Sequence, residues 1–432
     1  MSLSNSVKTW IIDPAVHNSS RTEFRLTEGM LSSQLKLVDV GVYSTNIVDR
    51  STGVFYPSIL GCLVAIKKIS LFSGSTMIDE IQELAAYGAV QHLRVSNQAQ
   101  EDLNRFELLN GHSFALKADD APLNTFNLQG TLTLQASHKD YVKTYNESAG
   151  SFKQYFNNQV QVSNTPDGAA SGMLVLSSYL EFLRSVPILP NIPDLRLIIE
   201  WNLNTSDYYV DTNAPTAVTP VLQPIRPQLM YEEILGLPAS EGLLKIPYQS
   251  CIVERFIVPA AADGVSVSSS FRSGAFRNRF LKDLVFFNKV QTNDDYIRAK
   301  ERSLSPREEK LQLSLNAKKY LPDNGVSTEA MKLQYFNETM GSLNIPLAAA
   351  MSGFNDYTSN KYRCLDPQAG VMSHNFSVGA VMINDVVDRM DIEVSRKGSN
   401  AGSDQTSQYD LLLFGRVNRL MELQGGVVRL SY

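Results

Sequence analysis

The stretch LRLIIEWN at residues 195–202 decides the fold of this 432-residue chain, because Leu195, Leu197, Ile199 and Trp201 place large apolar side chains at every second position. Large apolar side chains at every second position indicate a β-strand with one buried face. The stretch MDIEV at residues 390–394 repeats the alternation near the other end of the chain. Strands of this kind are typical of antiparallel sheets that are covered on one side. We therefore expect an all-β protein.

Each alternating strand follows a block that occurs twice. In the first block, the apolar stretch 62–66 reads as a strand and precedes a helix-like pattern beginning at Met77. In the second block, the strand-like stretch 311–315 precedes a similar pattern beginning at Met331, 254 residues after the first. A repeat this long indicates two similar β-rich domains in tandem, because the repeats of a solenoid are much shorter.

Helices are few. The spacing of apolar residues predicts one helix over 76–87 and a second over 328–340. Gly88 and Gly341 stand where a glycine commonly ends a helix in the left-handed conformation. A further short helical turn is expected over 179–185.

The domain organisation follows from the repeat and from polar or proline-rich stretches. We expect an N-terminal arm over 1–30, a first domain over 31–236 and a second domain over 237–432. The first domain has more chain between its helix and its alternating strand than the second. The excess falls near 95–175, which is rich in Asn, Ser, Gln and Gly and reads as a long polar surface insertion.

Composition excludes several classes of protein. The chain is 43% hydrophobic and 19% charged, as expected of a folded globular protein, and its net charge of −5 gives no basic excess for phosphate binding. One basic cluster alternates with phenylalanines; it consists of Phe271, Arg272, Phe276, Arg277, Arg279, Phe280 and Lys282. Solvated arginines over core phenylalanines explain this pattern better than a nucleic-acid site, so no specific nucleic-acid binding is expected.

The N-terminal residues lack the apolar region of a secretory signal, and no stretch approaches the about 18 apolar residues of a membrane span. The three cysteines, Cys62, Cys251 and Cys364, are too few and too far apart to form a disulfide framework. We expect them to pack as small apolar residues in a protein made in a reducing compartment.

A catalytic constellation is missing from the sequence. None of the five histidines lies within four residues of another, and no phosphate-binding loop or nucleophile elbow occurs. We therefore expect no catalytic, cofactor-binding or metal-binding residues, no cofactor and no enzymatic activity. The alternative is a tandem sandwich that binds or hydrolyses carbohydrate, for which Trp201, Tyr208 and Tyr209 are the candidate aromatic residues, although core packing is favoured for Trp201.

Several stretches resemble the double jelly-roll major capsid proteins of the adenovirus-like lineage, especially those of Polinton-like viruses and virophages. The stretches that carry the resemblance are 182–190, 195–200, 225–234, 246–250, 271–274, 281–284 and 419–430. They include a proline-bearing approach, an LRLxIE-like strand and a P-x-L-x-Y strand at the end of the first jelly roll. Together they cover about 180–430, and their motifs are degenerate.

The resemblance implies two tandem eight-stranded antiparallel jelly rolls with a few short helices. It further implies a structural protein of a DNA virus that forms homotrimeric, pseudo-hexagonal capsomers in an icosahedral shell. The expected location is the virion. The expected partners are other copies of the chain and penton and minor capsid proteins, with an internal membrane as a further candidate, while the N-terminal arm would tie neighbouring capsomers together.

Overall fold

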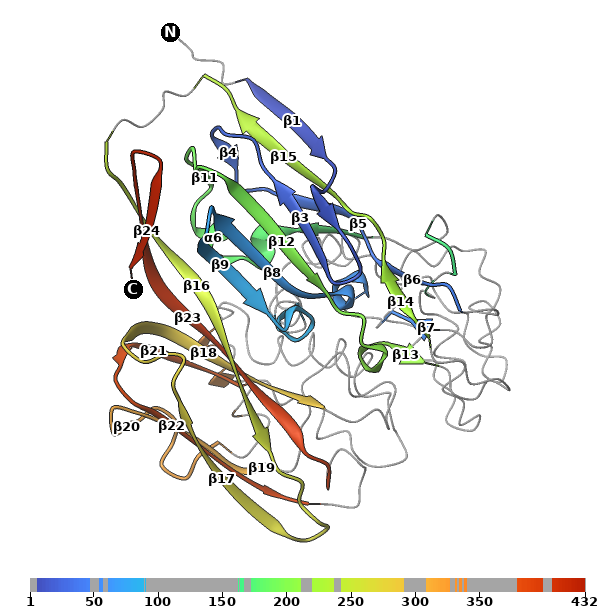
Figure 1. Cartoon of the computed structure of the whole chain (residues 1–432). Helices are drawn as coiled ribbons and strands as arrows, with labels where there is room; N and C mark the ends of the chain where they lie inside the picture. The colour runs from blue at the N-terminus through green and yellow to red at the C-terminus, as the bar shows by residue number, and fades with distance from the viewer. Residues whose placement is uncertain are drawn as a thin grey trace, which may run out of the picture.

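Two antiparallel β-sandwiches make up the computed structural model, one from each half of the chain (Figure 1). The structure describes residues 6–46, 54–56, 61–88, 172–210, 220–236, 242–290, 308–326, 379–398 and 406–431, with a few further positions at 90, 162, 164–166 and within 331–339.

In the first sandwich, one sheet has the strand order β10-β5-β15-β4-β11, and β1 pairs with β15. Its strands are β1 (Val7–Ile12), β4 (Leu31–Ser32), β5 (Lys36–Val40), β10 (Gly172–Val175), β11 (Ile188–Leu189) and β15 (Gln228–Ile234). The facing sheet has the order β2-β3-β12-β8-β9. Its strands are β2 (Val16–His17), β3 (Arg21–Arg25), β8 (Ile66–Ser73), β9 (Thr76–Gln82) and β12 (Leu195–Trp201).

Short elements extend the first sandwich. Two small strand pairs join β6 (Val42–Ser44) to β14 (Leu222–Pro224) and β7 (Val54–Phe55) to β13 (Tyr209–Val210). The helical elements are η2 (Gly61–Ala65), η5 (Leu176–Ser178), α6 (Glu181–Ser185) and η6 (Thr205–Asp207).

The second sandwich repeats this plan. One sheet has the order β16-β23-β18-β21, with β24 paired to β23, and the other has the order β17-β22-β19-β20. The strands are β16 (Leu244–Val258), β17 (Ser266–Ser273), β18 (Arg279–Val290), β19 (Glu308–Leu315), β20 (Lys318–Lys319), β21 (Gly379–Val387), β22 (Met390–Lys397), β23 (Tyr409–Gln424) and β24 (Val427–Ser431).

The two sandwiches correspond strand by strand. Strands β1, β15, β5 and β10 are neighbours in the same order as β16, β23, β18 and β21. Likewise, β3, β12, β8 and β9 match β17, β22, β19 and β20. In both halves the chain alternates between the two sheets in the same sequence, which is the two-sheet jelly-roll arrangement. The all-β fold of two jelly rolls predicted from the sequence is therefore confirmed.

The alternating strands behave as predicted. In β12, the residues Leu195, Leu197, Ile199 and Trp201 are buried while those between them are half exposed. In β22, Met390, Ile392 and Val394 are buried on one face. The nearly continuous apolar run in β18 is buried on both faces from Asp283 to Asn288.

The repeated block is less regular than the sequence suggested. Residues 62–66 were expected to be a strand, but Gly61–Ala65 is the 3₁₀ helix η2, and the strand begins at Ile66. The helix expected over 76–87 is also wrong, since Thr76–Gln82 is strand β9 and helical residues begin only at Leu84. Gly74 has a φ of 54° and forms a tight turn with Ser75, so the following residues pair back onto β8.

The other helix predictions fare better. Residues 331, 334, 335, 338 and 339 are helical, in agreement with the helix predicted over 328–340, whose remaining positions lie outside the described residues. The helical turn expected over 179–185 is confirmed by α6. The insertion predicted near 95–175 lies almost entirely outside the described residues, as do residues 237–241 at the start of the expected second domain.

The N-terminal residues differ from the independent arm expected over 1–30. Strand β1 pairs with β15 along its whole length, and β3 pairs with β12. Each of these strands adds to a sheet of the first sandwich, so both belong to its body.

Candidate functional site: the interface between the two sandwiches

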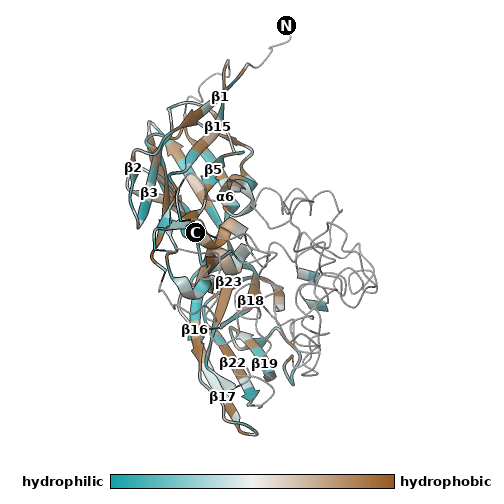
Figure 2. Ribbon diagram, turned by 90° about the vertical axis from the view of Figure 1, so that its right-hand side faces the viewer, coloured by the Kyte–Doolittle hydropathy of each residue, from teal (hydrophilic) through white to brown (hydrophobic). Residues whose placement is uncertain are grey.

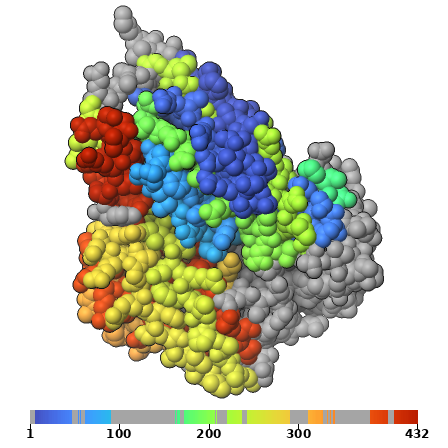
Figure 3. Space-filling view, in the orientation of Figure 1, coloured from blue at the N-terminus to red at the C-terminus, as the bar shows by residue number. Residues whose placement is uncertain are grey.

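The two sandwiches are joined by the longest strands in the described structure, β16 with 15 residues and β23 with 16. Both strands belong to a sheet of the second sandwich; β16 also lies against β9 and α6 of the first, and β23 reaches β9 through Arg419 (Figure 1). The space-filling view shows the C-terminal strands, in red, directly beside the light-blue segment of the first sandwich (Figure 3). A single sheet therefore contributes to both hydrophobic cores.

Buried apolar residues show how unequal this sharing is. The second core contains only residues between Val258 and Val417. The first core takes in its own residues and also several from the second half; these are Tyr248, Cys251, Val285, Phe287, Ala380, Leu412, Phe414, Met421 and Val428. Burial of apolar area is the main stabilising term in folding, so the first sandwich depends on the second for part of its stability.

Two aromatic pairs lie in the interface. The rings of Phe182 and Tyr248 meet edge to face, with centroids 4.8 Å apart and an interplanar angle of 83°. The rings of Tyr87 and Phe414 lie 5.4 Å apart. Both geometries are favourable for aromatic pairs.

Side chains of the second sandwich donate hydrogen bonds to a backbone carbonyl on the outer edge of β9. The carbonyl oxygen of Ile78 accepts hydrogen bonds from the Tyr248 hydroxyl, at 2.7 Å, and from Nη1 of Arg419, at 3.0 Å. An edge strand offers unpaired backbone groups that would otherwise bind another chain. Here the protein's own second half covers that edge.

Asp79 lies fully buried at the centre of the interface. Its carboxylate oxygens accept hydrogen bonds from the Ser250 hydroxyl, at 2.7 Å, and from the backbone N–H of Phe182, at 2.9 Å. The pKa of Asp79 is raised to about 7, mainly because the carboxyl is buried; the two hydrogen bonds oppose this rise, and the nearby Glu181 carboxylate adds to it. One buried carboxyl thus connects β9, α6 and β16.

Glu181 forms a second buried polar contact. Its carboxylate accepts a hydrogen bond from the Tyr87 hydroxyl and one from Nη1 of Arg184, both at 2.8 Å. Burial, together with the Glu181 charge, raises the pKa of Tyr87 well above its usual value, so this hydroxyl remains a hydrogen-bond donor. Arg184 also donates to the carbonyl oxygen of Ser178, which fixes α6 against the preceding turn.

Charged pairs lie beside this cluster. Nε of Arg416 donates to both carboxylate oxygens of Asp283, at 2.8 and 3.0 Å, and this pair joins β23 to β18. Lys289 of β18 reaches across to Glu83 at 2.8 Å and to Asp207 at 3.9 Å, so ion pairs of this lysine directly link the two sandwiches. Paired and hydrogen-bonded charges are the form in which charge is tolerated in a protein interior.

The arrangement is suited to holding two units together and not to catalysis. Its carboxylates are buried and already bonded, so they have no access to a substrate. Sequence reasoning named no site residues and missed this cluster. The available signals were Glu181, between Leu180 and Phe182, and Asp283, in the largely apolar run of β18, because a charged residue requires a partner when buried.

The residues considered for other functions lie elsewhere. Trp201 is buried and donates from Nε1 to the Thr22 hydroxyl at 2.9 Å, and Tyr208 is buried with its hydroxyl bonded to the carbonyl of Asn202. Cys62 and Cys251 are buried and free, whereas Cys364 lies outside the described residues. Within the described ranges, no group of three or more His, Cys, Asp or Glu side chains could hold a metal ion, and no helix could span a membrane.

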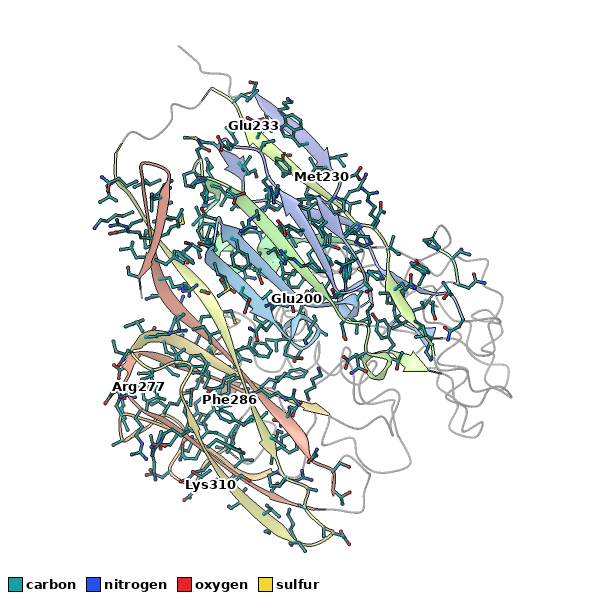
Figure 4. The ribbon with its side chains drawn as sticks, viewed as in Figure 1. Glu200, Met230, Glu233, Arg277, Phe286 and Lys310 are labelled. Atoms are coloured by element: carbon teal, nitrogen blue, oxygen red, sulfur yellow. The ribbon has the colours of Figure 1, made fainter. Side chains whose placement is uncertain are left out.

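The basic residues that alternate with phenylalanines in the sequence lie on strands β17 and β18 and in the turn between them. Phe276 is fully buried and Phe271 stacks on Phe256 with centroids 5.0 Å apart. Arg272 forms an ion pair with Asp391 on the neighbouring strand, and Arg277 is exposed in the turn between β17 and β18, labelled in Figure 4. This agrees with solvated arginines over core phenylalanines.

Comparison with known proteins finds solved structures whose folds are similar to that of this chain. No family model and no curated protein matches the chain. A chain in the structure of the Sputnik virophage matches with a TM-score of 0.56 and 13% identity, covering 99% of this chain and 88% of that one. The PBCV-1 virus capsid matches with a TM-score of 0.51 and 8% identity, over 100% and 98% of the two chains. The mavirus major capsid protein matches with a TM-score of 0.51 and 9% identity, over 98% and 90%.

These similarities extend over nearly the whole of each chain. At such low identity they establish the fold, which is the double jelly roll of viral major capsid proteins. The resemblance inferred from the sequence is therefore confirmed at the level of the fold.

Proposed function

We propose that this protein is a viral major capsid protein that assembles into homotrimeric, pseudo-hexagonal capsomers. The observation that carries the proposal is the strand-by-strand equivalence of two jelly rolls joined through a shared sheet. Two similar units side by side form a block, and three blocks around a three-fold axis present six similar units. Such a ring can tile an icosahedral shell with nearly six-fold contacts.

The two ends of each sandwich support the same proposal. The turns at one end are short: residues 74–75 join β8 to β9, residues 316–317 join β19 to β20, and residues 388–389 join β21 to β22. The connections at the other end are long, such as those from Gln82 to Gly172 and from Lys319 to Gly379. A wall unit needs one regular end and one end that is free to vary, and we assign the long connections to the outer surface.

The short-turn end of the second sandwich is tied together by Asn316. Its side-chain oxygen accepts hydrogen bonds from the backbone N–H groups of Asp388 and Arg389, and its Nδ2 donates to the carbonyl of Val386. Two turns are thereby held together, which fits a base that bears on other shell components. Penton and minor capsid proteins, and an internal membrane, belong to the same proposal, as does location in the virion.

No catalytic step forms part of the proposed function. The carbohydrate alternative loses two of its three candidate aromatic residues because Trp201 and Tyr208 are buried and cannot stack on a sugar, while the side chain of Tyr209 lies outside the described residues. We place the boundary between the two structural units within residues 237–242, and the first unit includes the strands that precede residue 31.

The test is the mass and shape of the purified full-length protein. Light scattering after size-exclusion chromatography should give a trimer of the 48.0 kDa chain, and electron microscopy should show particles with pseudo-hexagonal outlines. A monomer that persists at micromolar concentration, both alone and with the other proteins of its virion, would overturn the proposal. A glycan array serves as the test of the alternative, and we expect it to show no binding.

A further inference from the structure

The outer edge of β1 is open in the described structure. Strand β1 pairs with β15 on one side, and no described strand pairs with its other side (Figure 1). Val7 and Ile11 on this strand are 55% and 60% exposed, although both are strongly apolar. Figure 2 shows β1 at the upper end of the molecule with brown, hydrophobic stretches. An exposed apolar edge of this kind is a template for another strand.

Three other edge strands, β16, β9 and β21, each carry a feature that hinders pairing with another strand, whereas β1 has neither a proline nor a bulge. The equivalent strand of the second sandwich, β16, has Pro247 and the charged residues Lys245 and Arg255 at exposed positions. Proline and charge are the usual ways to prevent pairing at an edge. The edge of β9 is covered by Tyr248 and Arg419, and β21 carries a bulge in its pairing with β18.

The backbone hydrogen bonds of β1 define which groups face outward. The N–H of Leu235 donates to the carbonyl of Ser6 at 2.9 Å, and Ser6 stands opposite Leu235 in the register of β1 and β15. Hydrogen-bonded pairs alternate along an antiparallel ladder. The N–H and C=O groups of Val7, Thr9 and Ile11 therefore point away from β15, toward the open edge.

The strand is complementary to itself about Thr9. When a second β1 lies antiparallel to the first with Thr9 opposite Thr9, Val7 stands opposite Ile11 on each side of the two-fold axis. All three outward-facing residues then exchange backbone hydrogen bonds with their counterparts, because the same residues carry the free groups in both strands. Cross-strand pairs of β-branched residues are among those that stabilise sheets.

The opposite face of β1 adds a matching polar contact. The Lys8 ammonium lies 3.6 Å from the centroid of the Trp10 ring, and Nε1 of Trp10 donates to Glu233, whose position is labelled in Figure 4. In the two-fold pairing, Lys8 of each copy stands directly opposite Trp10 of the other. Each ammonium can then contact an aromatic ring and approach a carboxylate across the junction.

We propose that β1 is a docking strand for the β1 strand of a second copy, paired antiparallel about Thr9. This contact is isologous, so it joins chains in pairs. A trimer requires a different, heterologous contact. Placing the β1 pair between neighbouring capsomers rests on the proposed function, whereas the pairing itself does not.

Cysteine cross-linking of the full-length protein tests the register. With Cys364→Ser as background, Thr9→Cys should form a disulfide between chains, because paired Cα atoms lie about 5.5 Å apart, within disulfide range. Val7→Cys and Ile11→Cys should each remain uncross-linked alone, since four residues of strand separate identical positions by about 13 Å. A mixture of these two variants, tagged to differ in mass, should yield the mixed disulfide.

A proline substitution supplies the second arm. Thr9→Pro removes an N–H that faces outward, so the pairing with β15 and the fold should be retained while association through β1 is lost. Lys8→Pro is the matched control, because it removes an N–H that faces β15 and should lower the melting temperature.

The outcomes separate the two proposals. Trimers of Thr9→Cys that form no disulfide between chains, or Val7→Cys that cross-links as well alone as in the mixture, would overturn the β1 pairing and leave the capsomer proposal standing. Specific Thr9→Cys cross-links in a protein that never forms trimers would overturn the capsomer proposal and leave the β1 pairing standing. Unchanged association of Thr9→Pro would also count against the β1 pairing.

Discussion

The two jelly rolls share one topology but differ in how they are stabilised. The second has a core made entirely of its own strands, whereas the first completes its core with residues such as Tyr248, Met421 and Val428 from the other half. The polar contacts follow the same division, because Asp79 and Glu181 lie at the face where the two rolls meet. A duplicated fold can therefore consist of one self-contained unit and one dependent unit.

The sharpest test of this difference compares two phenylalanines. Phe414 belongs to the second roll by sequence but packs in the first core against Tyr87, while Phe286 packs only in the second core and is labelled in Figure 4. Replacing either by alanine should cost about 3–5 kcal/mol, since both are buried. Hydrogen exchange should show that Phe414→Ala also loosens β9 and α6 of the first roll. Phe286→Ala should leave those elements protected, and equal loss in both variants would remove the asymmetry.

The next largest effect is the pH dependence of the interface. Because the pKa of Asp79 is raised to about 7 from 3.8, the folded protein holds a proton between about pH 4 and pH 7 that the unfolded chain releases. Stability should therefore fall as pH rises through this window, by roughly 4 kcal/mol over the whole of it and by roughly 2–3 kcal/mol between pH 5 and pH 8. Asp79→Asn, which mimics the neutral acid, should abolish this part of the dependence. Urea unfolding at pH 5 and pH 8 measures it, and a wild type that gains stability toward pH 8 relative to the variant would contradict it.

A smaller effect concerns the hydroxyl of Tyr87. Tyr87→Phe leaves the buried Glu181 carboxylate with one hydrogen bond fewer and should cost about 1–2 kcal/mol. The matched control is Tyr56→Phe, whose hydroxyl bonds to the backbone of Val42 away from the interface. Both variants should destabilise the first roll, but only Tyr87→Phe should reduce the protection of α6. The same hydrogen-exchange experiment distinguishes them.

The smallest effects compare equivalent turns of the two rolls. Gly74 in the β8–β9 turn has a φ of 54°, and Ala317 in the β19–β20 turn has a φ of 65°. The left-handed conformation is less favourable for an alanine than the right-handed one by about 1–2 kcal/mol. Gly74→Ala should therefore lower stability by about 1 kcal/mol, and Ala317→Gly should raise it by up to a similar amount. Thermal unfolding that shifts in the same direction for both would show that the turns are not equivalent.

The sequence predicted those parts of the fold that carry their own pattern. The alternation at Leu195–Trp201 and Met390–Lys397 identified strands because one face of each is buried and the other is not. Thr76–Gln82 was mistaken for a helix because Met77, Ile81 and Leu84 have helical spacing, whereas pairing with β8 determines the structure. Strand β1 looked like a polar arm, since nothing local reveals its pairing with β15.

The interface cluster was beyond sequence reasoning for a related reason. Asp79 follows Ile78 and Glu181 stands between Leu180 and Phe182, but nothing near either residue in the sequence shows which group it bonds to. Ser250, which bonds to Asp79, comes 171 residues later in the chain. Only the packing of one roll against the other buries these groups, and that packing leaves no periodic signal.

The sharing of β23 between the two cores has a consequence for synthesis. Met421 and Val428, which complete the first core, are synthesised 187 and 194 residues after Ile234, where β15 of the first roll ends. At about 5–20 residues per second, the ribosome needs roughly 10–40 s to add the second roll after finishing the first. During that interval the apolar face of β9 and α6 has no cover, so a nascent chain would need a chaperone or rapid translation to avoid aggregation.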